Sequence, residues 1–195
     1  MIKILIAKSS SGKDYILKHI VSNGLATPII SYTSRPIRDG EKHGVDYYYT
    51  TTNIFENMID NHELIEYRKY NTLVDNKPAT WYYGMRRQKF DKNKNYIVIL
   101  DVGGANEFIK QVDNCEVYFI EADDNLRTQW AMKRGSFDKY EWERRMKDDD
   151  VEISEDKLSD YVKENVKINH IKNYGQNIEL IVDKIMNEWY NKDIK

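Results

Sequence analysis

The chain has 195 residues, of which 41% are hydrophobic and 32% charged, and its formal net charge is −2. This balance is typical of a soluble globular protein. The chain lacks the broad positive charge of a nucleic-acid-binding protein, so that class is not indicated. The single cysteine, Cys115, excludes an internal disulfide, and the apolar run 2–7 is too short for a membrane span or signal segment. We therefore expect one large domain, or a domain with inserted lobes, in the cytoplasm. We expect a monomer or homodimer without nucleic-acid or membrane partners.

The first predicted elements are a strand, a loop of small residues and a helix. Residues 2–7 form an apolar run with β-branched residues, which is typical of a buried strand. After the loop "KSSSG" (8–12), apolar residues recur at helical spacing over 16–21, and Gly24 suits the end of the helix. A strand, a small-residue loop and a helix are the context that a phosphate-binding loop requires.

The stretch "AKSSSGKD" (7–14) matches the phosphate-loop pattern G-x-x-x-x-G-K-[ST] only at Gly12 and Lys13. Ala7 replaces the first glycine, and Asp14 replaces the hydroxyl residue that binds Mg²⁺. Such a loop points backbone N–H groups at phosphate oxygens, and its lysine reaches the outer phosphates. A carboxylate suits Mg²⁺, so Asp14 can serve the same ion directly or through water. An ordinary strand-to-helix turn, with Asp14 favoured by the helix dipole, explains the loop alone equally well.

The middle of the chain predicts a mixture of short elements. Asn53 and Glu56 form a capping box at the start of an amphipathic helix. The other predicted features are strands at 28–33 and 63–67, a polar, basic segment at 34–49 and a turn around 75–76.

The second half alternates strands and helices, which implies an α/β protein with a mainly parallel sheet covered on both faces. Buried strands are predicted at 96–101, 116–122 and 166–170. Helices are predicted over 103–112, from Asp123 to about Arg134, over 138–149 and 154–164, and from Ile178 to Trp189.

The segment "ISYTSRPIRDGEKHGVDYYY" (30–49) resembles the nucleotide-monophosphate lobe of guanylate kinases. Its pattern there is close to S-x-T-x-R-x-x-R-x-G-E-x-x-G-x-D-Y. Two arginines three residues apart can clamp one phosphate, and a tyrosine can add a hydroxyl. The residues in register are Ser31, Thr33, Arg35, Arg38, Gly40, Glu41, Gly44, Asp46 and Tyr47.

The resemblance continues through the next strands. "ELIEY" (63–67) resembles the strand whose glutamate binds the guanine edge, which implies Glu66, and "YYG" resembles Y-Y-G-[ST], which implies that Tyr83 contacts the phosphate. Met85 stands where a hydroxyl would read the guanine O6, and losing that donor weakens base discrimination. The segment between Glu66 and Tyr83 is about eight residues longer than the family pattern leads us to expect.

The remaining family segments contain the other candidate residues. "YIVILDVGGA" (96–105) resembles I-L-D-x-D-x-Q-G-A, and without a gap Asp101 aligns with the second carboxylate, near the base. Asp101 can instead help to organise Mg²⁺ or cap the following helix. "LRTQWAMKRG" and "ERRM" resemble the lid, in which Arg134 and Arg145, eleven residues apart, would stabilise the transferring phosphoryl group. Arg127 and Lys133 can assist them.

The resemblance implies a P-loop three-layer α/β fold with a parallel central sheet, a nucleotide-binding lobe and a helical lid. The core would comprise 1–30, 91–123 and 151–195, the lobe 31–90 and the lid 124–150. The implied activity is phosphorylation of GMP or dGMP by ATP with Mg²⁺. The implied catalytic residues are Lys13, Arg134 and Arg145, and the implied Mg²⁺ ligands are Asp14 and Asp101. The implied ATP-binding residues are Ser9, Ser10, Ser11, Gly12, Lys13, Asp14 and Asn169. The implied GMP-binding residues are Ser31, Arg35, Arg38, Glu41, Tyr47, Glu66, Tyr83, Met85 and Asp101.

Two alternatives remain open from the sequence. Asp14 resembles the G-K-D loops of some phage deoxynucleotide kinases, so the acceptor can be another or a modified nucleoside monophosphate. Some guanylate kinase-like domains are inactive modules that bind phosphorylated peptides, but those typically lose the loop lysine, whereas Lys13 is present here.

Overall fold

The apolar run at the start of the chain forms the middle strand of a parallel sheet. Strand β1 (Ile2–Ala7) lies between β7 (Tyr96–Ile99) and β8 (Cys115–Glu121), and β2 (Thr27–Pro28) and β9 (Ile168–Lys172) complete the order β2-β7-β1-β8-β9. Every neighbouring pair in this sheet is parallel. The computed structural model describes residues 1–190 except 75–76, 134–136, 155–156, 159–165 and 176.

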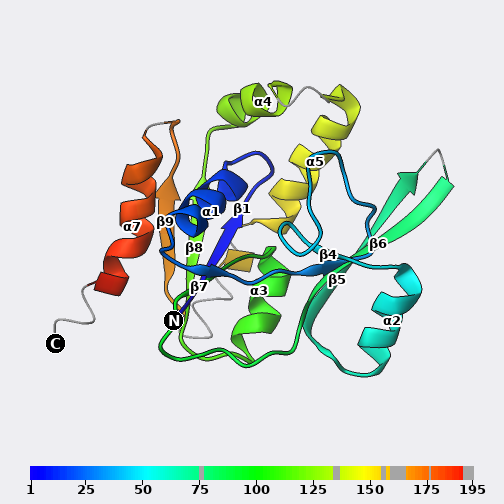
Figure 1. Cartoon of the computed structure of the whole chain (residues 1–195). Helices are drawn as coiled ribbons and strands as arrows, with labels where there is room; N and C mark the ends of the chain where they lie inside the picture. The colour runs from blue at the N-terminus through cyan, green and yellow to red at the C-terminus, as the bar shows by residue number, and fades with distance from the viewer. Residues whose placement is uncertain (75–76, 134–136, 155–156, 159–165, 176, 191–195) are drawn as a thin grey trace.

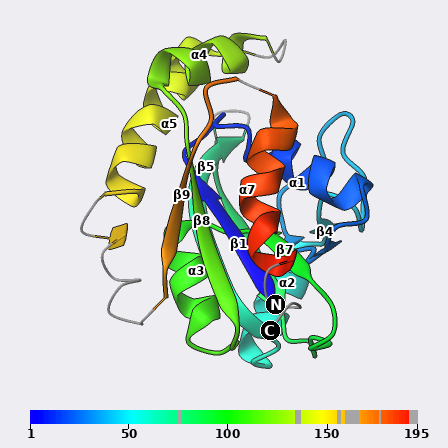
Figure 2. The ribbon, with the colours of Figure 1, turned by 90° about the vertical axis from the view of Figure 1, so that its left-hand side faces the viewer.

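Helices cover both faces of this central sheet. Side chains alternate along β1, so Ile4 and Leu5 belong to different core clusters. Helix α3 (Val102–Ile109) packs on the face of Ile4, and α1 (Lys13–Ser22) and α7 (Ile178–Tyr190) pack on the face of Leu5 (Figure 2). The α/β fold with a parallel central sheet that the sequence predicts is therefore confirmed.

A second sheet lies beside the first (Figure 1). Its order is β4 (Tyr48–Tyr49), β3 (Tyr32–Thr33), β6 (Lys77–Arg86) and β5 (Leu64–Val74). Strands β5 and β6 are antiparallel along almost their whole length, so they form a long hairpin. The apolar face of α2 (Thr52–Asp60) packs against this sheet.

Two charged helices follow β8 at the carboxyl edge of the central sheet. They are α4 (Asp124–Met132) and α5 (Lys139–Glu152), and they lie at the top of Figure 1. Asp123 and Asp138 cap them, because each side chain accepts a backbone N–H from the first helical turn. The loop after β1 reaches the same edge, so these helices and the loop meet.

Some local predictions were wrong. The run 28–33 is not one strand, because β2 belongs to the central sheet and β3 to the second sheet. Helix α2 is capped by Thr51, whose hydroxyl accepts the N–H of Ile54 at 3.2 Å, and not by Asn53. The predicted helix at 154–164 and the turn at 75–76 lie largely outside the described residues. In the described part of the chain, no helix has both the length and the apolar character to cross a membrane.

Candidate active site

The loop Lys8–Gly12 joins the end of β1 to the start of α1. Gly12 has a φ of 89° and Ser10 a φ of 57°, both in the left-handed region that glycine adopts most easily. A Cβ on Gly12 would lie 2.7 Å from Nδ2 of Asn173, which donates a hydrogen bond to the carbonyl of Ser11 at 2.9 Å. Glycine is therefore needed here both for its conformation and for its lack of a side chain.

The hydroxyl of Ser11 is buried and bonds to no other described residue. An unpaired buried hydroxyl is costly unless a ligand completes its hydrogen bonds. It lies at the N-terminus of α1, where backbone N–H groups favour an anion. The loop thus has the features of an anion-binding site.

Lys13 and Asp14 occupy the first turn of α1. The Lys13 side chain is 23% exposed and that of Asp14 is 59% exposed, and Nζ lies 3.6 Å from Oδ2. Within the described residues, no three His, Cys, Asp or Glu side chains are close enough to hold a metal ion by themselves. Mg²⁺ usually keeps several waters and takes only one or two ligands from protein carboxylates, so the single carboxylate of Asp14 would need oxygen ligands from elsewhere to hold this ion.

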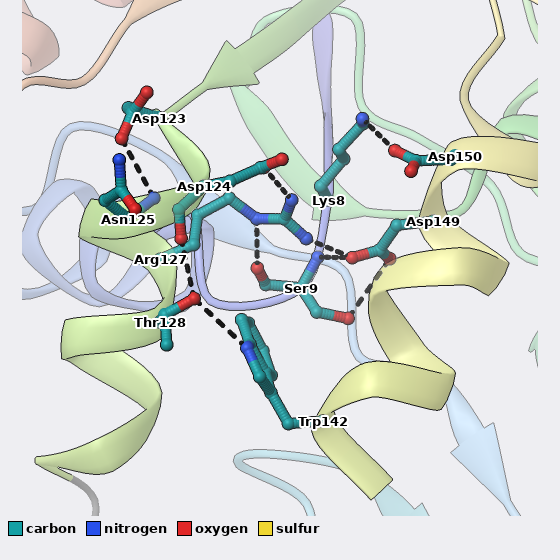
Figure 3. Close-up of polar contacts among 10 residues, drawn as sticks. All are labelled: Lys8, Ser9, Asp123, Asp124, Asn125, Arg127, Thr128, Trp142, Asp149 and Asp150. Atoms are coloured by element: carbon teal, nitrogen blue, oxygen red, sulfur yellow. Dashed lines mark hydrogen bonds and ion pairs between the residues drawn. The ribbon is translucent and has the colours of Figure 1, made fainter. Parts of the chain in front are cut away.

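An ion-pair network joins the two charged helices to this loop (Figure 3). Arg127 of α4 is fully buried and donates to the carbonyl of Ser9 at 2.8 Å, to Asp124 at 2.6 Å and to Asp149 of α5. Asp149 also accepts hydrogen bonds from the backbone N–H and hydroxyl of Ser9, at 2.8 and 3.1 Å. Beside this network, Lys8 donates to the exposed Asp150 at 2.5 Å.

Arg127 therefore holds the loop in position from a buried site, whereas the sequence predicts an assistant to the lid arginines. Arg145 of α5 is 44% exposed and lies 4.0 Å from a carboxylate oxygen of Glu141. Its predicted partner, Arg134, lies outside the described residues.

A second polar cluster surrounds Arg35. This side chain is only 3% exposed, and its guanidinium donates to both oxygens of Glu41, at 2.8 and 3.0 Å. Glu41 also accepts from the backbone N–H of Arg38 and from the hydroxyl of Tyr49, each at 2.8 Å. Burial acts to raise the pKa of Glu41, but these hydrogen bonds outweigh it and lower the pKa to about 2.

Aromatic side chains line the same place. The Arg35 guanidinium lies 5.7 Å from the ring centre of Tyr47, and the ring of Tyr47 meets that of Tyr83 edge to face at 5.8 Å. Burial raises the pKa of Tyr47, so its hydroxyl remains a neutral donor at neutral pH. Arg38 is exposed beside them, and Ser31 accepts the N–H of Tyr48 through its carbonyl at 2.9 Å.

A third polar group lies where β5 meets the start of α3. Asp101 caps α3 by accepting the N–H of Gly104 at 2.6 Å, which confirms the capping interpretation. Its carboxylate also accepts from Nε of Arg68 at 3.2 Å and from the hydroxyl of Tyr70 at 2.6 Å. Both oxygens of Asp101 are thus engaged within the protein.

Glu66 is 5% exposed beside Asp101. Burial, with a smaller contribution from Asp101, raises the pKa of Glu66 to about 8, and Arg68 partly opposes this rise. Met85 lies opposite Glu66 on β6 and is fully buried in the apolar core. Met85 therefore presents no polar group to a ligand.

The sequence does not indicate two residues that contact the loop, Asn173 and Asp149. Asn173 lies just after β9 and contacts the loop. The predicted Asn169 lies within β9, and its amide donates to the carbonyl of Val117 at 3.4 Å. Asp149 lies in the charged run 148–150, where nothing in the pattern separates it from its solvated neighbours. A strand-end position could have indicated Asn173, because the carboxyl ends of parallel strands share one edge.

A parallel central sheet with a glycine-containing loop after β1, and a second sheet beside a buried arginine, define an α/β protein with two lobes of polar side chains. The sequence profile of the guanylate kinase family matches residues 2–171. The chain therefore belongs to the guanylate kinase family.

Individual relatives agree with this assignment. The chain is 30% identical over 188 residues to a guanylate kinase of Blochmanniella floridana, covering 92% of this chain and 86% of that one. It is 37% identical over 109 residues to that of Bacteroides thetaiotaomicron, where the match covers 53% of this chain. The chain spans about half the length of the Bacteroides relatives that it matches, 50% in each case. The crystal structure of a guanylate kinase from Anaplasma phagocytophilum superposes with a TM-score of 0.63 at 23% identity, covering 100% of this chain and 87% of that one.

Proposed function

We propose that this protein is a nucleoside-monophosphate kinase that transfers the γ-phosphoryl group of ATP to GMP or dGMP. The observation that carries the proposal is the presence of two separate basic arrangements in one chain: the glycine-dependent loop with Lys13, and the buried Arg35 held by Glu41. A phosphoryl transfer between nucleotides needs one such site for the donor and one for the acceptor.

The donor would bind at the loop with Mg²⁺, which neutralises phosphate charge. Backbone N–H groups at the start of α1 and the Ser11 hydroxyl would bind phosphate oxygens, and Lys13 would bind the outer phosphates. Ser9, Ser10, Gly12 and Asp14 would complete this site. Asn169 would lie near the donor base, and Asn173 supports the loop through the Ser11 carbonyl.

The acceptor phosphate would bind to Arg35, Arg38, Tyr47 and Tyr83. Ser31 and Glu41 would support these groups, and Glu66 would bind the base. An oxygen of the acceptor phosphate attacks the γ-phosphorus in line, the bond from that phosphorus to the β–γ bridging oxygen breaks, and ADP leaves. No protein nucleophile is needed, so Lys13, Arg134 and Arg145 would act by stabilising charge on the transferring group.

Closure of two lobes would bring donor and acceptor together. The proposed lobe of residues 31–90 contains the second sheet, and the proposed lid of residues 124–150 contains α4 and most of α5. The core would then be 1–30, 91–123 and 151–195. We further propose a cytoplasmic protein, monomeric or homodimeric, whose partners are small nucleotides.

The test is ADP release from ATP and Mg²⁺ with GMP, dGMP, AMP, dAMP, UMP or dTMP as acceptor. A preference for GMP or dGMP supports the proposal, and turnover with a different nucleotide alone keeps the chemistry but changes the acceptor. A folded protein that binds GMP by calorimetry and releases no ADP with any acceptor would be a binding module, and the proposal would be wrong.

A further inference from the structure

Glu66 and Arg68 extend from one face of β5 toward the start of α3. They are two residues apart on a strand, so their side chains lie on the same side. A Cβ on Gly103 would lie 2.3 Å from Nη2 of Arg68, and a Cβ on Gly104 would lie 2.8 Å from Oε2 of Glu66. Two consecutive glycines thus make room for an acidic and a basic side chain placed next to each other.

The guanidinium of Arg68 is held in one orientation, but only some of its N–H groups donate hydrogen bonds to the protein. Its Nε donates to Asp101 at 3.2 Å, and its Nη1 makes a long contact of 3.4 Å to the carbonyl of Tyr67. Among the described residues, none accepts a hydrogen bond from Nη2, and the side chain is 31% exposed. Asp101 is itself fixed by Tyr70 and Gly104, so the arginine is held by one edge while its outer N–H groups remain available.

This pairing of groups matches the edge of a 6-oxopurine. Such a base has a donor at N1–H and adjacent acceptors at O6 and N7, and arginine binds O6 and N7 through two N–H groups. Adenine has an amino donor in place of O6, which would face the guanidinium N–H groups unfavourably. The side chain of the neighbouring Met85 is fully buried and has no donor, and its backbone N–H already bonds to Glu66. Within the described part of the chain, Arg68 therefore offers N–H groups on this side of the site.

We propose that Arg68 is a specificity-determining residue that reads O6 and N7 of the acceptor purine, while Glu66 accepts from N1–H. The inference rests on the proposed function, because it needs the acceptor base to lie at the start of α3. It narrows the acceptors to 6-oxopurine nucleotides, and it provides a donor for O6 in a site where position 85 is a methionine.

The test combines a substitution with changes of single atoms in the substrate. Wild-type protein and Arg68→Met are compared with GMP, with 7-deaza-GMP, which lacks N7, and with 6-thio-GMP, in which sulfur replaces O6. We expect kcat/KM for GMP to fall roughly 10- to 100-fold in Arg68→Met, while the values for the analogues fall much less. The preference for GMP over each analogue should therefore nearly vanish in the variant.

Two further variants separate base reading from structural support. Lys69→Met removes an exposed lysine from the opposite face of the same strand and should leave the preference of the wild type unchanged. Arg68→Lys keeps the charge but loses the planar pair of donors, so its preference should be intermediate. Thermal unfolding of each variant shows whether the fold is retained.

An equal loss of kcat/KM for all three nucleotides in Arg68→Met would show that Arg68 only supports the site, and the inference would be overturned. An unchanged preference would overturn it as well. If the wild type releases no ADP with any acceptor, the proposed function fails. The same comparison of variants and nucleotides, made by binding calorimetry, then decides the role of Arg68.

Discussion

Asp149 of α5 accepts hydrogen bonds from both the backbone N–H and the hydroxyl of Ser9, at 2.8 and 3.1 Å. The same carboxylate neutralises the buried guanidinium of Arg127 on α4. A single acidic side chain therefore connects two helices with the loop that we propose binds the donor phosphates.

Asp149→Ala should destabilise the protein by about 3 kcal/mol, because it leaves the charge of Arg127 buried without its main partner. Asp150→Ala is the matched control: this neighbour is 62% exposed and pairs with Lys8, so its loss should cost less than about 1 kcal/mol. Urea unfolding of both variants measures the difference. Equal losses would show that the network around Ser9 contributes no more than a surface ion pair.

Lys13→Ala should lower kcat for phosphoryl transfer by roughly 10²–10³-fold, because the variant loses a positive charge placed at the outer phosphates. Binding of GMP, measured by calorimetry without ATP, should stay within about twofold, because the acceptor groups around Arg35 do not include Lys13. Lys110→Ala removes an exposed lysine at the C-cap of α3 and serves as control. A parallel loss of GMP affinity in Lys13→Ala would contradict separate donor and acceptor sites.

Glu41 should stabilise the fold only above moderately acidic pH. Its pKa in the folded protein is about 2, below the ordinary 4.5, so its contribution is present above pH 4.5 and is lost as the pH falls toward 2. Glu41→Gln should be less stable than the wild type at pH 6 by about 1–3 kcal/mol, because Arg35 loses a charged partner. The difference should shrink at pH 3, as measured by urea unfolding at both pH values. A difference that does not depend on pH would contradict the ion pair.

Glu66 should have the opposite effect. Its pKa in the folded protein is about 8, above the ordinary 4.5, so its contribution to stability is present below pH 4.5 and is lost as the pH rises toward 8. Asp101 and Arg68 are the charged groups that face it, and they act in opposite directions. Glu66→Gln should therefore gain stability relative to the wild type between pH 5 and pH 8. Stability curves that stay parallel over this interval would show that Glu66 ionises normally.

The three middle strands of the central sheet, β1, β7 and β8, could be predicted because they are largely buried and appear as short, continuous apolar runs. The run 28–33 looked the same, but the backbone passes from one sheet to the other within it, and no residue type marks that change of hydrogen-bonding partner. A dense sequence pattern predicted that the residues around Arg35 bind a phosphate, and this stays a prediction. The structure shows that Glu41 is the acidic residue that pairs with Arg35.

Residues that are distant from the loop in sequence but contact it in the folded chain were harder to predict. Asn173 and Asp149 are 162 and 140 residues away in sequence from the loop residues they contact. Their positions follow from the order of strands and the path of α5, which a local pattern does not contain. Arg68 was also missed, because its significance depends on Gly103, which lies on a different element.

The convergence of Tyr70, Arg68 and the N–H of Gly104 on Asp101 has a mechanical consequence. It attaches the middle of β5, in the second sheet, to the first turn of α3, in the core. The segment with Arg35 and Arg38 lies toward the far side of that sheet, where Asp46 pairs with the exposed Lys18 of the core at 3.1 Å. If the second sheet rotates about this attachment, residues near Asp101 move least. Arg35 and Arg38, which lie far from the attachment, move most.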